Sequence, residues 1–92
     1  MPTLLVIDDD PSFRRVIEFQ LKEAGHRVIV ASHGREGLQF FSDHPCDLVL
    51  TDLEMKEVSG LDVLRQIKQQ SPDIPVIVIT GFGSIAYSSL YR

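Results

Sequence analysis

The sequence predicts a single α/β domain with a parallel sheet and helices on both of its faces. Its short apolar runs are continuous, which is typical of strands buried on both sides. Amphipathic stretches with helical spacing separate these runs, and strict strand–helix alternation implies right-handed crossovers. The 92 residues, 43% hydrophobic and 24% charged, suit one domain with a modest core and exclude a disordered chain, collagen or a coiled coil.

The first strand is expected at residues 4–7, where an apolar run stops abruptly at three consecutive aspartates. Asp10 and Pro11 predict the start of a helix, because Asp favours the N-cap and Pro suits the first helical position. Gly25 is placed to end this helix. Its apolar face is expected to carry Phe13, Val16, Ile17, Leu21 and Ala24.

The second unit is a strand over residues 27–31 and a weaker helix from about residue 35 to 42. Gly37 lies inside that helix, where glycine costs about 1 kcal/mol relative to alanine. A third strand is expected over residues 47–51, followed directly by Asp52.

The next helix has a clear start and end. Ser59 and Asp62 resemble a capping box, and Pro72 closes the helix. Its apolar face carries Leu61, Leu64 and Ile67. A fourth strand is expected over residues 75–80.

Composition excludes several classes of protein. Nine Lys and Arg against 13 Asp and Glu give a formal charge of −4, which argues against direct nucleic-acid binding. No apolar run approaches the roughly 20 residues of a membrane span, and no basic, apolar leader resembles a signal peptide. Cys46 has no partner for a disulfide or a zinc site. We therefore expect a cytoplasmic protein without membrane or nucleic-acid contacts.

Acidic residues follow two of the predicted strands, where parallel α/β sheets place their chemistry. Asp8 and Asp9 end the first strand, Asp52 ends the third, and Thr80 ends the fourth. Crowded carboxylates repel one another unless a cation lies between them, and oxygen ligands with room for water suit Mg²⁺. Asp10 is explained as a helix cap.

These strand ends resemble the receiver domain of response regulators in two-component, or phosphorelay, signalling. The resemblance covers about residues 3 to 85. It rests on three motifs in the right order, namely residues 5–10, residues 47–55 with Gly60 behind them, and residues 76–81.

The resemblance implies a role for each matching residue. Asp52 would be the phosphoacceptor, and Thr80 would contact the phosphoryl group. Asp8, Asp9, Asp52 and the main-chain carbonyl of Glu54 would hold Mg²⁺. The phosphoryl donor would be a sensor histidine kinase or a phosphotransfer protein, and the domain would not be a turnover enzyme. The assignment agrees with chemistry in which the protein mainly supplies position and charge compensation.

The sequence departs from the family in two places. Lys56 stands where proline is usual, which we interpret as a tolerated loop change, and Glu54 places a carboxylate two residues from the acceptor.

A larger departure lies at the end of the sequence. The family's flavodoxin-like fold, a three-layer α/β/α arrangement of strand order 2-1-3-4-5, has a fifth strand ending in a lysine, and a fifth helix. After Lys68 the sequence has no lysine, and from Ala86 onward nothing matches these elements. Residues 1–92 are therefore expected to form an incomplete receiver whose phosphorylation is impaired.

Two other functions are consistent with parts of the sequence. The missing lysine favours a pseudo-receiver that binds partners without phosphorylation. Residues 4–10 also fit the strand end of haloacid-dehalogenase-like phosphatases, although the downstream lysine and acidic pair of that class are absent. The phosphorylated residue separates the three hypotheses: Asp52 for the receiver, Asp8 for the phosphatase, and neither for the pseudo-receiver.

Residues 81–85 are reminiscent of regulators with enhancer-dependent transcription outputs.

The fourth strand also predicts an assembly. Without a fifth strand its apolar edge would be bare, and such edges recruit other strands. We therefore expect a homodimer, paired through strand four or through the C-terminal segment, residues 86–92.

Overall fold

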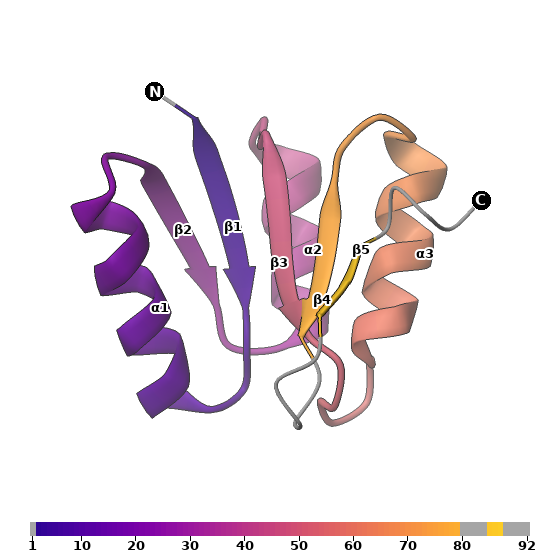
Figure 1. The fold of residues 1–92 in the computed structure, drawn as a ribbon. Helices are drawn as coiled ribbons and strands as arrows, with labels where there is room; N and C mark the ends of the chain where they lie inside the picture. The colour runs from indigo at the N-terminus through magenta and orange to yellow at the C-terminus, as the bar shows by residue number, and fades with distance from the viewer. Residues whose placement is uncertain (1, 80–84, 88–92) are drawn as a thin grey trace.

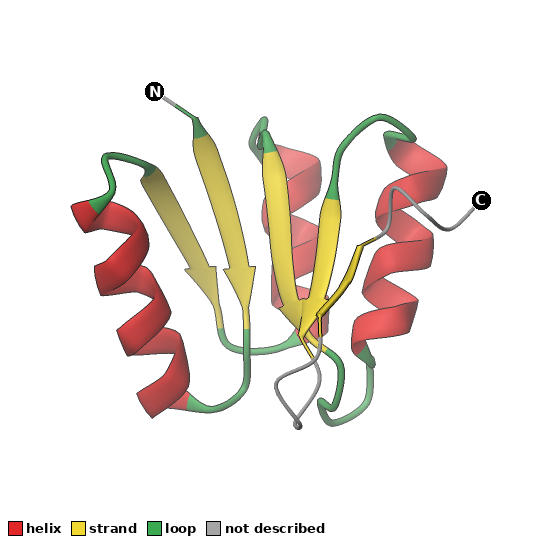
Figure 2. Ribbon diagram, viewed as in Figure 1, coloured by secondary structure: helices red, strands yellow, loops and turns green. Residues whose placement is uncertain are grey.

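The computed structural model describes residues 2–79 and 85–87, in which five strands form one sheet of order β2-β1-β3-β4-β5 (Figure 1). Strands and helices alternate along the chain up to β4 (Figure 2). The elements are β1 (Thr3–Ile7), α1 (Pro11–Glu23), β2 (Arg27–Ala31), α2 (Gly34–Asp43), β3 (Leu48–Asp52), α3 (Gly60–Gln70), β4 (Val76–Ile79) and β5 (Ile85–Tyr87).

Strands β2, β1, β3 and β4 are parallel, which confirms the predicted flavodoxin-like order 2-1-3-4. Helix α1 contacts β1 and β2 on one face of the sheet, and α2 and α3 cover the other face (Figure 1). None of the helices in the described part of the chain is long and apolar enough to cross a membrane.

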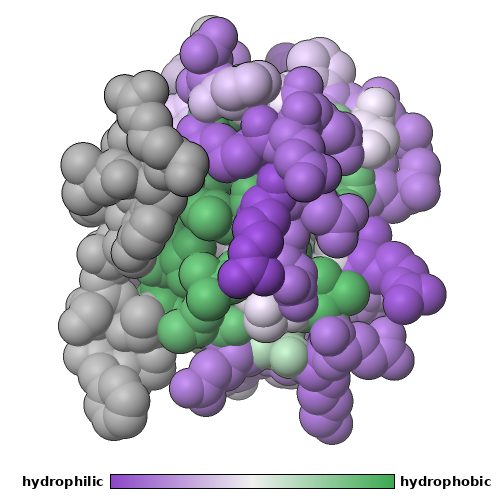
Figure 3. Space-filling model, turned by 90° about the vertical axis from the view of Figure 1, so that its right-hand side faces the viewer, coloured by the Kyte–Doolittle hydropathy of each residue, from purple (hydrophilic) through white to green (hydrophobic). Residues whose placement is uncertain are grey.

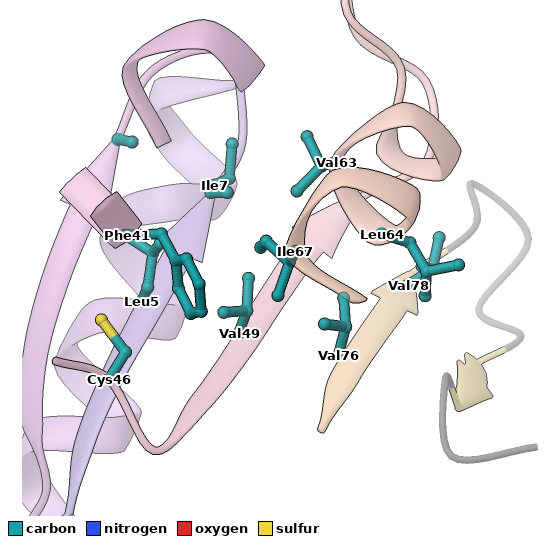
Figure 4. Packing of buried hydrophobic residues seen from close by; sticks show 11 residues of the cluster. Leu5, Ile7, Phe41, Cys46, Val49, Val63, Leu64, Ile67, Val76 and Val78 are labelled. Atoms are coloured by element: carbon teal, nitrogen blue, oxygen red, sulfur yellow. The ribbon is translucent and has the colours of Figure 1, made fainter. Parts of the chain in front are cut away.

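The core lies between the sheet and the helices α2 and α3 (Figure 4). Leu5 and Val49 project from the strands toward Phe41 of α2 and Ile67 of α3, and all four are at most 9% exposed. Burial of each such side chain contributes about 1.5 to 3 kcal/mol to the stability of the fold. The outer side of α3 is hydrophilic (Figure 3).

The predicted helix starts are confirmed. The side chain of Asp10 caps α1 by accepting hydrogen bonds from the backbone N–H groups of Ser12 at 2.9 Å and Phe13 at 3.4 Å. Ser59 and Asp62 form the reciprocal capping box of α3. Such caps satisfy backbone donors that a helix leaves unpaired.

The structure also explains why a glycine lies inside α2. A Cβ on Gly37 would overlap the side chain of Ile7 in β1. The intrinsic cost of glycine in this helix is therefore offset by close packing of α2 on the sheet.

One expectation about the sheet is corrected, namely that the edge of β4 is bare. In place of the family's parallel fifth strand, the short segment Ile85–Tyr87 forms β5, which pairs antiparallel with Ile77–Ile79 of β4. The edge of β4 is therefore not bare along these three residues, because the chain returns on itself and satisfies the backbone groups there. Of the other C-terminal residues for which predictions were made, Thr80 and residues 81–84 and 88–92 lie outside the described residues.

Candidate functional site

Three carboxylates meet at the carboxyl ends of β1 and β3. One oxygen from each of Asp8, Asp9 and Asp52 lies within 4.8 Å of the other two. The pairing of Ile7 with Thr51 in adjacent parallel strands brings the residues after each strand to the same edge of the sheet. The predicted acidic cluster is thus formed.

Asp8 is the most buried member of the cluster, with 4% of its surface exposed. The backbone N–H of Asp10 donates to its Oδ1 at 2.8 Å, and Arg14 Nη1 donates to its main-chain carbonyl at 2.8 Å. Burial raises the pKa of Asp8, and the charges of Asp9 and Asp10 raise it further, against the effects of the Asp10 N–H and Arg14. The fold therefore holds a carboxylate that is not fully compensated.

Asp52 ends the central strand β3 and is partly exposed. Burial raises its pKa first, the charges of Asp8 and Asp9 raise it further, and the backbone N–H groups of Leu53 and Glu54 oppose the shift. The carboxylates therefore repel one another, and a cation between them would remove this cost. The oxygen-only donor set and the exposure of Asp9 fit a hard cation that keeps several waters, such as Mg²⁺.

The backbone that follows Asp52 at the end of β3 is fixed on both sides. The N–H of Leu53 donates to the carbonyl of Ile79 at 2.9 Å, and the N–H of Gly60 donates to the carbonyl of Leu53 at 2.9 Å. The start of α3 is thus tied to the residue that follows Asp52. In the loop between them, Glu57 has a φ of 66°, in the left-handed region that favours glycine.

An open hollow adjoins the acidic cluster at the same loop. Asp9, Glu54, Lys56 and Ser59 supply its polar lining. The apolar part of the lining comes from Leu53, Met55 and Leu61. Lys56 therefore borders the same hollow as Asp9, which belongs to the acidic cluster. The place of Lys56 at this hollow differs from its interpretation as a tolerated loop change, and its position four residues after Asp52 is the signal in the sequence.

The other predicted site residues have different outcomes. Asp10 caps α1 and is outside the cluster of three oxygens. Glu54 lies in the loop after β3 and lines the hollow; the role of its carbonyl as a metal ligand stays a prediction. Thr80 lies outside the described residues, so its predicted contact with the phosphoryl group is not placed.

Comparison with known proteins points to one family. The model of the response regulator receiver domain matches residues 4–90. The transcriptional regulatory protein GlrR of Escherichia coli (strain K12) is 38% identical over 82 residues, which cover 89% of this chain and 18% of that protein. The chain therefore spans less than a fifth of the length of this relative.

Two solved structures have the same fold. A response regulator receiver domain protein from Clostridium thermocellum is 40% identical, with a TM-score of 0.86, over 90% of this chain and 68% of its own. The response regulator TrrA from Thermotoga maritima, solved in complex with Mg²⁺-BeF, is 36% identical, with a TM-score of 0.84, over 87% of this chain and 70% of its own.

Proposed function

The chain belongs to the response regulator receiver family, and from this premise we propose that it accepts a phosphoryl group on Asp52 in phosphorelay signalling. The observation that carries the proposal is the meeting of Asp52 with Asp8 and Asp9 at one edge of the sheet. The donor is a phosphohistidine on a sensor kinase or a phosphotransfer protein. The domain takes part in its own modification and is not a turnover enzyme.

The transfer is a displacement at phosphorus. A carboxylate oxygen of Asp52 forms the new P–O bond while the P–N bond of the donor breaks. The bonding electrons pass to the imidazole nitrogen, which takes a proton from water. Asp52 is suited to this role because its strand is paired on both sides and is tied to α3 through Leu53.

Mg²⁺ fits the acidic cluster, and Asp8, Asp9 and Asp52 would hold it, with the main-chain carbonyl of Glu54 as the further proposed ligand. When bound, it supplies positive charge to the phosphoryl oxygens. The residues of the chain keep Asp8 in position through the Asp10 N–H and the Arg14 guanidinium.

Helix α1 supports docking of a partner close to Asp52. It begins directly after the acidic residues and exposes Phe13, Val16 and Phe19 by 37%, 53% and 64%. Exposed apolar patches of this kind mark interaction surfaces. A kinase or phosphotransfer protein seated along α1 would bring its phosphohistidine toward the acidic cluster.

Incubation with acetyl phosphate and Mg²⁺, followed by intact-mass analysis and peptide mapping, tests the proposal. We expect slow, low-yield modification of Asp52, since the sequence lacks a lysine after Lys68. Asp52→Asn should abolish the mass increase. Asp10→Asn is the matched control, because Asn keeps the cap and Asp10 is outside the cluster. Rapid stoichiometric labelling would contradict the impairment.

The same experiment addresses the alternatives. A pseudo-receiver, which the missing lysine favours, would show no labelling under any donor. A phosphatase of the haloacid-dehalogenase type would be labelled on Asp8, but that residue is only 4% exposed and is less accessible to a donor than Asp52.

The homodimer expected from the sequence stays a prediction, with a changed contact. β4 is paired with β5 at its edge, whereas Leu48, Leu50 and Ile77 line an apolar hollow on the sheet face beside α1. We expect two copies to cover these hollows for each other. Sedimentation at micromolar concentration should show a dimer that Ile77→Lys dissociates; a stable wild-type monomer would contradict it.

A cytoplasmic location and a role within a longer transcription regulator, as in the named relative, are further parts of the proposal.

A further inference from the structure

We propose that Lys56 supplies positive charge to the phosphoryl group on Asp52, contacting it from the loop between β3 and α3. The inference rests on the proposed function and deepens it. Lys56, which the sequence indicates only as a tolerated loop change, lies at the hollow that adjoins the acidic cluster.

The charges of the modified site call for an additional cation. Asp8 and Asp9 contribute one negative charge each, and a phosphoryl group adds about two. One divalent cation therefore leaves an excess of about two negative charges in a partly desolvated site. A nearby ammonium or guanidinium group would reduce this excess.

Among the basic residues that the structure describes, Lys56 is the one that lines this hollow. It lines the hollow together with Asp9 and Glu54, and it is exposed. Arg14 is also near, but its guanidinium is engaged by the main-chain carbonyl of Asp8 at 2.8 Å.

The ammonium group of Lys56 has no hydrogen bond or ion pair within residues 2–79 and 85–87. Several other basic side chains there are engaged elsewhere: Lys22 with Glu18, Arg35 with Glu57, Arg65 with Asp62, and Lys68 with the carbonyls of Pro72 and Ile74. Lys56 can therefore reorient without breaking a hydrogen bond or ion pair to this described part of the chain.

The backbone around Lys56 is held in place while its side chain is exposed. The main-chain carbonyl of Lys56 accepts a hydrogen bond from the N–H of Val58 at 2.8 Å, and Gly60 ties the end of the loop to Leu53. A compact ammonium on a flexible four-carbon stem suits a contact that forms only after the phosphoryl group arrives. This would give the modified state an interaction that the unmodified state lacks.

A charge in this position has opposite effects on two ligands. It repels Mg²⁺ in the unmodified site and attracts an anionic phosphoryl group in the modified one. Lys56→Gln should therefore tighten Mg²⁺ binding and weaken binding of a phosphoryl mimic. A merely structural role in the loop would move both affinities in the same direction.

The experiment measures both affinities by NMR titration of the full chain. Mg²⁺ is added first, and beryllofluoride is then added at saturating Mg²⁺. For Lys56→Gln we expect Mg²⁺ to bind about two- to threefold tighter and beryllofluoride about three- to tenfold weaker. Lys56→Arg should restore beryllofluoride binding, and added salt should shrink the difference because the charge is exposed.

Lys22→Gln, which removes the same charge at the far end of α1, is the matched control and should leave both affinities unchanged. If Lys56→Gln behaves like this control, or weakens both ligands together, the role of Lys56 is refuted while the proposed function stands. If the wild-type chain binds neither Mg²⁺ nor beryllofluoride, both proposals fail.

Discussion

The backbone at Asp52 lies directly against Gly60, the first residue of α3. A Cβ on Gly60 would overlap the carbonyl oxygen of Asp52 and would lie 2.8 Å from the Cα of Leu53. The N–H of Gly60 also donates to the carbonyl of Leu53. Asp52 and the start of α3 are therefore coupled through the main chain, where no side chain can move to make room.

Gly60→Ala should consequently destabilise the fold by about 1 to 3 kcal/mol, because overpacking against backbone forces a shift of the loop. Chemical denaturation monitored by circular dichroism measures this change in the free energy of unfolding. Gln69→Ala, on the exposed side of the same helix, is the control and should change stability by less than about 0.5 kcal/mol. Equal stability of Gly60→Ala and wild type would show that the loop relaxes freely.

Asp8→Asn should stabilise the metal-free protein at neutral pH. The folded-state pKa of Asp8 is raised above its unfolded value, so its ionised form is disfavoured in the fold. Asn keeps an oxygen for the Asp10 N–H and removes the repelling charge. We expect a higher melting temperature for the variant in EDTA. Added Mg²⁺ should raise the melting temperature of wild type more than that of Asp8→Asn; the reverse order would contradict a metal site there.

The pH dependence of stability should change sign between neutral and acidic pH in the absence of metal. As pH falls through the raised pKa values of Asp8 and Asp52, wild type should gain stability, because protonation removes their repulsion. Glu36 behaves in the opposite way: hydrogen bonds from Ser32 lower its pKa below 4.5, so its contribution is present above that value and is lost as pH falls through the lowered pKa.

Thermal melts from pH 7 to pH 3 check both effects, the gain of stability from Asp8 and Asp52 and the loss of stability from Glu36. Asp8→Asn should flatten the gain on moderate acidification, and Glu36→Gln should flatten the loss at lower pH. A wild-type profile that only declines from pH 7 would contradict the raised carboxylate pKa values.

Mg²⁺ should bind weakly, and its affinity should depend on the exposed carboxylate of Asp9 as well as on Asp52. Asp9→Asn and Asp52→Asn should each reduce the chemical-shift response of residues 8–10 and 52–54 to Mg²⁺, since each removes a charged ligand. Asp43→Asn, at the end of α2, supplies the control for a change in net charge. Identical titration curves for wild type and both site variants would refute the metal site.

Glu57→Gly should stabilise the loop by about 0.5 to 1 kcal/mol, because a side chain is unfavourable at a φ of 66° and glycine is not. Glu57→Gln keeps the strained backbone and removes only the exposed contact with Arg35 at 3.9 Å, so it should change stability little. Chemical denaturation distinguishes the two. A loss of stability in Glu57→Gly would mean that the Arg35 contact outweighs the strain.

Much of the fold could be predicted from the sequence because its signals are local. Continuous apolar runs indicated four buried strands, and Asp10 and Ser59 indicated helix starts, since periodicity and capping depend on neighbouring residues. The meeting of Asp8 with Asp52 also followed, because parallel strands end at a common edge.

Other features depended on packing between residues far apart in the chain. The pairing of Ile85–Tyr87 with β4 could not be predicted, because three residues carry too little periodicity to indicate a strand. Burial of Asp8 against exposure of Asp9, and the position of Lys56 beside Asp9, likewise required the assembled fold. Residue type and order determined which groups reach the edge of the sheet. The burial of the carboxylates there, the repulsion between them and the hollow that Lys56 shares with Asp9 depend on distances, and only tertiary packing sets these distances.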